Sequence, residues 1–139
     1  MDMKKILITI LAGIFIFTLI SCGGKYDDAV KVNNEFIDAM EEYVTEAEKA
    51  SSSKEMARVI TRYAEKIRAL APKLKELRGK YPELNNPETI PDELKDLEIK
   101  AASLQQKMTA SFTNMVKYMM DTDVQTAFQK LQNAMMEME

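Results

Sequence analysis

Apolar side chains recur along most of this chain at alternating intervals of four and three residues, and no other feature limits its possible folds so strongly. This spacing keeps side chains on one face of an α-helix, because 3.6 residues make one turn. The clearest stripe consists of Met56, Ile60, Tyr63, Ile67, Leu70, Leu74, Leu77 and Tyr81. The chain is therefore predicted to be all-α.

Capping signals divide the stripes into four helices, three long and one short. The first helix is predicted over 27–50 from its apolar stripe, and a connection is predicted at 81–87. The other predicted starts are the capping box Ser52–Glu55, the pair Thr89–Asp92 with Pro91 in the first turn, and Asp121-Thr122-Asp123. An antiparallel up-down helical bundle is the expected architecture.

Two positions leave alternatives open. Pro72 lies inside the second stripe and predicts a kink near 68–72, with a complete break as the alternative. Without a turn at 121–123, residues 91–138 would form one helix of about 72 Å. That helix would project far beyond its neighbours and expose its apolar face. A turn is therefore favoured, and a three-helix bundle with a projecting helix is the alternative.

The amino-terminal residues have the layout of a secretory signal peptide. Lys4 and Lys5 precede an apolar run at 6–20, which is shorter than the roughly 20 residues of a spanning helix. The run ends in Leu19-Ile20-Ser21-Cys22, which resembles the lipobox of bacterial lipoproteins. The resemblance implies export, cleavage before Cys22, diacylglycerol on its sulfur and acylation of the new amino terminus. An uncleaved anchor helix and an ordinary free cysteine are the alternatives.

Three parts of the chain follow from this resemblance: a cleaved signal peptide at 1–21, a lipid anchor and tether at 22–25, and a helical bundle domain at 26–139. Gly23 stands where an aspartate would signal retention in the inner membrane of many Gram-negative bacteria. The resemblance therefore implies the periplasmic face of the outer membrane. The three tether residues span at most about 11 Å, so the bundle is expected to lie close to the bilayer.

Charge is sorted by helix. Residues 26–50 hold eight acids and two bases, residues 54–80 hold nine bases and three acids, and residues 121–139 hold four acids and one base. Such sorting favours a basic helix between acidic neighbours, with charges that set the pairing of the helices. The alternative is a basic stripe that contacts anionic lipid head groups or an acidic partner, formed by Lys54, Arg58, Arg62 and Lys66.

Residue types that are absent exclude many chemistries. There is no histidine and only one cysteine, which excludes His-ligated zinc, His-activated nucleophiles and an intramolecular disulfide. The sequence predicts no enzyme and no cofactor. Thioethers are soft ligands for Cu(I), but methionine more often fills core gaps. The methionines that could face a ligand are Met108, Met115, Met119, Met135 and Met138.

The expected function is that of a membrane-anchored envelope lipoprotein acting as a non-catalytic interaction or structural module. Its partners would be the membrane, through lipid on Cys22, and another protein or a second copy. A net charge of −3 and an envelope location argue against nucleic acid. The alternative is a small protein that binds an apolar ligand or a soft metal ion in a Met-rich bundle.

Overall fold

The computed structural model describes residues 26–85 and 95–138, which form four α-helices and one short 3₁₀ helix, with no strand among them. The elements are α2 (Asp27–Lys49), α3 (Ser53–Lys80), η1 (Pro82–Asn85), α4 (Lys95–Val116) and α5 (Thr122–Met136). The predictions of an all-α fold and of four helices with a short last one are confirmed. The predicted signal peptide, Cys22 with its tether, and the Thr89–Asp92 cap lie outside the described residues.

The capping residues start the helices as their chemistry predicts. The Ser52 hydroxyl accepts the backbone N–H of Glu55 at 3.2 Å, and Glu55 in turn accepts the backbone N–H of Ser51 at 2.9 Å. Asp121 accepts the N–H of Asp123 at 2.9 Å and caps α5. The turn at 117–121 separates α4 from α5, so the single long helix considered as an alternative is wrong.

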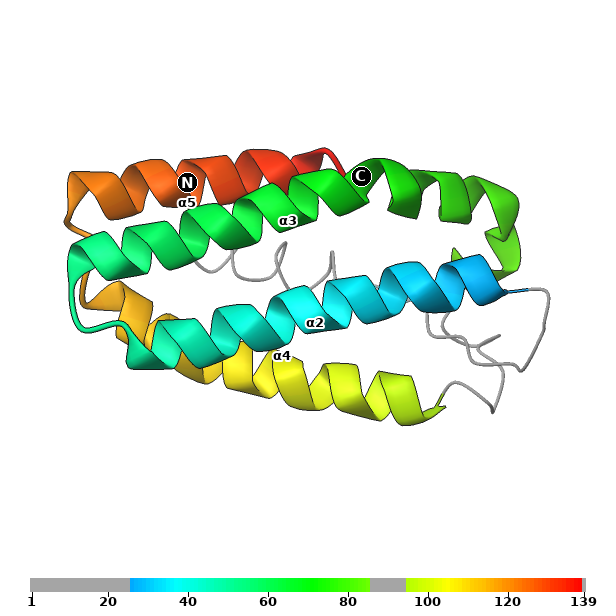
Figure 1. Ribbon diagram of the computed structural model, residues 1–139, viewed down its shortest axis with the longest axis horizontal. Helices are drawn as coiled ribbons and strands as arrows, with labels where there is room; N and C mark the ends of the chain where they lie inside the picture. The colour runs from blue at the N-terminus through cyan, green and yellow to red at the C-terminus, as the bar shows by residue number, and fades with distance from the viewer. Residues whose placement is uncertain (1–25, 86–94, 139) are drawn as a thin grey trace.

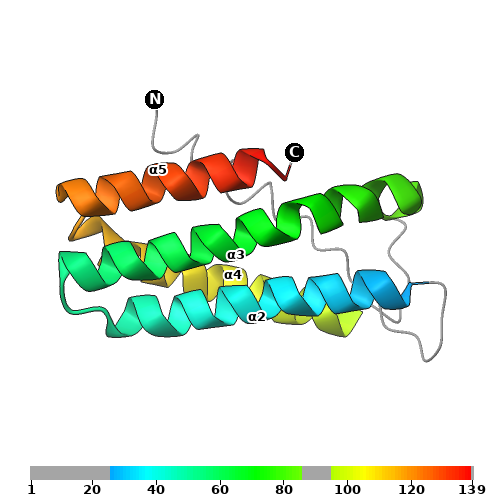
Figure 2. The same ribbon diagram turned by 45° about the horizontal axis from the view of Figure 1, so that its top comes forward.

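Helix α3 continues through Pro72 without interruption, which confirms a bend over a break. Its ribbon changes direction in the second half in both views (Figures 1 and 2). Pro72 is exposed, and so is Arg68, whose carbonyl Pro72 leaves without a helical donor. The second apolar stripe thus stays buried over the full length of the helix.

Helix α3 is central in the bundle because it packs against both α2 and α5, whereas α4 packs mainly on α2. Helices α3 and α5 run side by side in the same direction, and so do α2 and α4 (Figures 1 and 2). The two ends of the bundle therefore differ. One end holds the α2–α3 connection and the turn before α5, and the other holds the start of α2 and η1.

Small side chains allow α3 to approach α5 closely. Alanines at seven-residue intervals are buried on both helices, namely Ala57, Ala64 and Ala71 on α3 and Ala127 and Ala134 on α5. The distance between packed helices falls with the size of the residues at the contact. Helix α3 therefore buries two faces, a large-residue face toward α2 and an alanine face toward α5.

Candidate functional site

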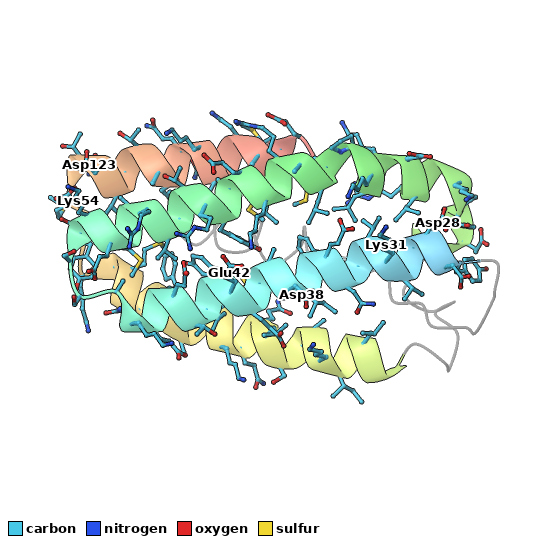
Figure 3. All side chains as sticks on the ribbon, in the orientation of Figure 1. Asp28, Lys31, Asp38, Glu42, Lys54 and Asp123 are labelled. Atoms are coloured by element: carbon cyan, nitrogen blue, oxygen red, sulfur yellow. The ribbon has the colours of Figure 1, made fainter. Side chains whose placement is uncertain are left out.

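The seam between α2 and α3 is lined by ion pairs at equal and opposite steps along the two helices. Figure 3 shows Glu42 at this seam. The pairs are Glu46–Arg62, Glu42–Lys66, Glu35–Lys73 and Asp28–Lys80, and together they are called the α2–α3 ladder below. From each pair to the next, the acidic partner lies four, seven and seven residues earlier on α2, and the basic partner lies the same number of residues later on α3. The ladder therefore specifies one antiparallel register.

The strongest geometry in the ladder is at Arg62, whose Nη1 donates to both carboxylate oxygens of Glu46 at 2.7 and 2.8 Å. Lys66 donates to Glu42, and this ammonium holds the pKa of the Glu42 carboxyl below its usual value. Side chains in these pairs keep about two fifths of their surface exposed, for example 42% for Arg62. Each pair is therefore worth at most about 1 kcal/mol, and its main effect is on register.

The ladder uses half of the predicted basic stripe. Arg62 and Lys66 are paired with α2, whereas Lys54 and Arg58 are exposed. Lys54 lies with Asp123 at the end of the bundle where α3 and α5 begin (Figure 3). The structure therefore supports the prediction of a basic helix held by an acidic neighbour, and it leaves two of the four bases for other contacts.

A groove of about 430 Å³ lies between the first halves of α3 and α5. Three bases line it, Arg58, Arg62 and Lys130, with two acids, Glu65 and Asp123, so its charges are mixed. A groove that selects an anion or a cation presents mainly one sign of charge. This groove has no such bias, and its floor is formed by the alanine contact of the two helices.

Two buried tyrosines form the polar centre of the core. The rings of Tyr43 and Tyr63 lie 4.8 Å apart, and the Tyr43 hydroxyl is 3.9 Å from the Met115 sulfur, to which it donates. Burial raises the pKa of Tyr43 to about 12, while a hydrogen bond with Ser111 opposes the shift. Burial also raises the pKa of Tyr63. Both phenols are therefore neutral at physiological pH, and neither is suited to act as a base.

A small cavity of about 10 Å³ adjoins these rings beneath the ladder, lined in part by Glu42, Tyr43, Arg62 and Tyr63. This volume admits at most one water molecule. It is far smaller than the roughly 300–1,000 Å³ of a small-molecule site. The tyrosine pair is thus a packing feature of the core rather than a ligand pocket.

The five methionines proposed to face a ligand are not gathered at one place. Met115 and Met119 precede α5, whereas Met135 and Met138 lie at its end, about 20 Å further along the helix axis. Met115 is 1% exposed and Met138 is 3% exposed, and both belong to the core. Met108, Met119 and Met135 are half-buried against it. The arrangement is typical of methionines that fill the core, and it does not form a multi-thioether site.

The start of α2 is fixed to the end of α3 by two tyrosines. The rings of Tyr26 and Tyr81 meet edge to face at 4.9 Å. Tyr26 donates to Glu83 and Tyr81 donates to Asp28, each at 2.9 Å. Lys80 pairs with the same Asp28 and lowers the pKa of its carboxyl. Tyr26, four positions after Cys22 in the sequence, is therefore held against the end of α3 and η1.

The outer face of α4 carries no charge, and the same holds for a shorter exposed stripe on α5 formed by Thr122, Gln125, Gln129, Asn133 and Met136. Exposed residues at three- and four-residue steps form one stripe, called the α4 outer stripe below: Ile99, Ala102, Gln106, Thr109, Thr113 and Val116. Ile99 is 66% exposed and Val116 is 46% exposed, and Met120 in the following turn is 91% exposed. Between Ile99 and Met120 the chain has three lysines and no acid. An exposed apolar helix face is typically covered by another element, and on this stripe the apolar side chains stand at the two ends.

Sequence reasoning missed this second stripe, although its spacing and the missing acids could have revealed it. The described residues contain no group of three or more histidine, cysteine, aspartate or glutamate side chains that could hold a metal ion. The described helices include none long and apolar enough to cross a membrane. No protein-family model matches the chain, and the comparisons with curated proteins and with solved structures give no match either.

Proposed function

We propose that this protein is an envelope lipoprotein, anchored through lipid on Cys22, whose up-down helical bundle acts as a non-catalytic interaction module. The lipobox resemblance of 19–22 and the basic, apolar leader before it support the anchor. By the same resemblance, the proposed location is the periplasmic face of the outer membrane. The interaction role rests on the α4 outer stripe.

The interaction role is assigned to the α4 outer stripe because packing within the described bundle leaves it exposed. Charges on α2 and α3 pair with each other across the ladder, and the apolar sides of all four helices already share one core. The α4 outer stripe remains exposed and neutral. Covering it costs no desolvation of a charged group, and covering the charged faces of α2 or α3 does. It is therefore better suited to a partner than the charged faces of α2 and α3, and it is longer than the uncharged face of α5.

The anchor also determines how the module is presented. Helix α2 begins five residues after Cys22 and is about 34 Å long. Since Tyr26 is fixed to α3, only residues 23–25 separate the rigid bundle from the lipid. The end of the bundle formed by Tyr26, Tyr81 and η1 is then held near the membrane. The turn at 117–121 lies at the opposite end.

The anchor is tested by membrane fractionation of the full chain and its Cys22→Ala variant. The unaltered chain is expected in the outer-membrane fraction, with label from radioactive fatty acid. The Cys22→Ala variant is expected to carry no label. Equal labelling of the two chains would contradict lipid attachment at Cys22, and recovery with inner-membrane markers would contradict the proposed location.

The interaction role is tested by chemical crosslinking in intact envelopes, comparing Val116→Glu with Lys75→Glu. Both positions are exposed, on α4 and on α3 respectively, so neither change disturbs the core. Crosslinked products are expected with the unaltered chain and with Lys75→Glu, and they should be reduced several-fold with Val116→Glu. Products that are unchanged in Val116→Glu would show that α4 is not the interaction face.

A further inference from the structure

The methionines of the described residues differ sharply in exposure. Met120 is 91% exposed and Met136 is 62% exposed. The other methionines in this part of the chain are buried or half-buried: Met40, Met56, Met108, Met115, Met119, Met135 and Met138. A thioether has to meet an oxidant in solution before it reacts, so exposure of the sulfur governs which methionine is oxidised first. Met120 is therefore the described thioether most open to oxidation.

The turn between α4 and α5 holds Met120 outside the core. The Asp121 N–H donates to the Tyr118 carbonyl at 2.9 Å, and the Gln125 amide donates to the Met119 carbonyl at 3.0 Å. These hydrogen bonds fix the backbone on both sides of Met120. The Met119 side chain packs against the core, whereas that of Met120 lies in solvent. The exposure of Met120 is therefore a property of an ordered turn.

Met115, five residues earlier, has the opposite environment. It is 1% exposed, and its sulfur accepts the Tyr43 hydroxyl at 3.9 Å. An oxidant reaches this sulfur only when the core opens, and one of its lone pairs is already engaged. Two methionines that are close in the sequence are thus expected to differ widely in reactivity.

Oxidation of Met120 by a peroxide is a single balanced step. The sulfur attacks one peroxide oxygen, the S–O bond forms as the O–O bond breaks, and the departing hydroxide takes the proton of the transferred oxygen. The thioether is oxidised to a sulfoxide, and hydrogen peroxide is reduced to water. Water solvates the charges that separate in this step, and it surrounds the exposed Met120 but not a core sulfur. Methionine sulfoxide is reduced again by thiol-dependent reductases, so the change is reversible.

The site adjoins one end of the α4 outer stripe. Met120 follows Val116 by four residues, and the Met119 N–H donates to the Val116 carbonyl at 3.2 Å, which holds the turn against the end of α4. Oxidation converts the apolar Met120 side chain into a polar one. A contact that covers this end then has to remove water from the sulfoxide oxygen, which costs free energy unless a donor replaces it. The bundle itself is not affected, because Met120 does not belong to the core.

From these observations we propose that Met120 is a site of reversible oxidation by peroxides, and that its sulfoxide weakens contacts made through the adjoining end of the α4 outer stripe. The oxidation site rests on the exposure of Met120 alone. The effect on contacts rests on the proposed interaction role of the stripe. A partner that covers this end also shields the Met120 sulfur, so the site is to be tested on the uncovered chain.

Peptide mapping of the full, lipid-anchored chain purified in detergent tests the site. The chain is treated with increasing hydrogen peroxide, quenched, digested with trypsin and analysed by mass spectrometry. Cleavage after Lys117 separates Met120 from Met115, and fragmentation of the Met120 peptide distinguishes Met119. Sulfoxide is expected at Met120 first, several-fold faster than at Met119 or Met115. A Met120 rate no higher than either of these would overturn the site, and a sulfoxide that a methionine sulfoxide reductase with thiol fails to remove would overturn its reversibility.

Crosslinking in intact envelopes, with and without peroxide, tests the effect on contacts. Met120→Leu keeps an apolar side chain and removes the thioether, and Met136→Leu makes the same change at the exposed methionine of α5. Peroxide is expected to reduce the crosslinked products several-fold in the unaltered chain and in Met136→Leu, but not in Met120→Leu. An equal reduction in Met120→Leu would place the sensitive group elsewhere and overturn the proposed effect.

Failure of this inference is distinguishable from failure of the interaction role. If Val116→Glu leaves the crosslinked products unchanged, the interaction role is wrong, and the peptide map still decides the oxidation site. If Val116→Glu reduces the products but peroxide does not, the interaction role stands and the effect of Met120 oxidation is wrong.

Discussion

Replacing Tyr63 by phenylalanine is the most direct test of the packing at the α2–α3 seam. Tyr63 is 3% exposed and its ring packs on that of Tyr43. Within the described residues, its hydroxyl has no hydrogen-bond partner. A buried polar group without a partner costs about 1–3 kcal/mol. Tyr63→Phe removes this cost and keeps the ring, so we expect the free energy of unfolding to rise by about 1 kcal/mol.

The matched control is Tyr43→Phe. The Tyr43 hydroxyl has partners, since it donates to the Met115 sulfur at 3.9 Å and is hydrogen-bonded with Ser111. Removing it leaves those groups with fewer partners, and we expect a loss of about 0.5–1.5 kcal/mol. The two variants delete the same atom from neighbouring rings and should therefore shift stability in opposite directions.

Urea unfolding of residues 22–139 carrying Cys22→Ala, followed by far-ultraviolet circular dichroism, measures both changes. A gain of 1 kcal/mol corresponds to a rise of about 4 °C in Tm for a domain of this size. The reasoning fails if Tyr63→Phe lowers stability. That result would mean that a water in the 10 Å³ cavity joins the Tyr63 hydroxyl to the polar groups of the ladder.

Three more predictions concern charges and pH. Glu46→Arg and Arg62→Glu should each lower the free energy of unfolding by about 0.5–1 kcal/mol, and the double swap should recover most of it; additive losses would contradict the pairing. In the folded state Lys80 lowers the pKa of Asp28, and Lys66 lowers the pKa of Glu42. The stabilisation that these two carboxylates give the fold is therefore complete above their ordinary pKa values of 3.8 and 4.5. It should be lost as pH falls through the lowered pKa values, which urea unfolding between about pH 6 and pH 2 checks. Burial raises the pKa of Tyr43 from 10.0 to about 12, so stability should fall as pH rises through this range. Tyrosinate absorbance of Tyr43 appearing before helix is lost would contradict that burial.

Helix boundaries were predictable because they depend on local chemistry. Ser52 and Asp121 are caps whose side-chain oxygens satisfy free backbone N–H groups within three residues of themselves. The large apolar stripe of α3 was equally readable, because residues such as Ile60 and Ile67 bury the most surface. These features need no knowledge of which helix lies next to which.

The alanine contact of α3 with α5 was not predictable in the same way. Ala64 and Ala127 are buried because a neighbouring helix backbone approaches them, and a methyl group adds little to an apolar stripe. Alanine also has the highest helix propensity and is common on exposed helix faces. The same residue type therefore marks either a contact or a surface, and only the packing distinguishes them.

The register of α2 against α3 could be predicted from the sequence only in part. The ladder positions on the two helices have mirrored spacing, which is visible in the sequence once one pair is known. Choosing the first pair requires the hairpin geometry, because the acids of α2 that are not in the ladder, such as Asp38, offer competing registers. The connection at 50–52 removes this freedom, since it brings Lys49 and Ser53 close together.

The ladder also explains why α4, and not a more strongly charged helix, presents the open face. Charges on α2 and α3 are needed to hold the register of the central pair, so their outer surfaces keep flanking charges that resist burial. Helix α4 is held to α2 by its apolar inner stripe, by the Asn114 amide, which donates to the Ala47 carbonyl at 2.8 Å, and by one ion pair, Lys100 with Glu41 at 3.2 Å. None of these contacts uses a residue of the α4 outer stripe. The stripe can consequently be covered without burying a charged side chain of its own.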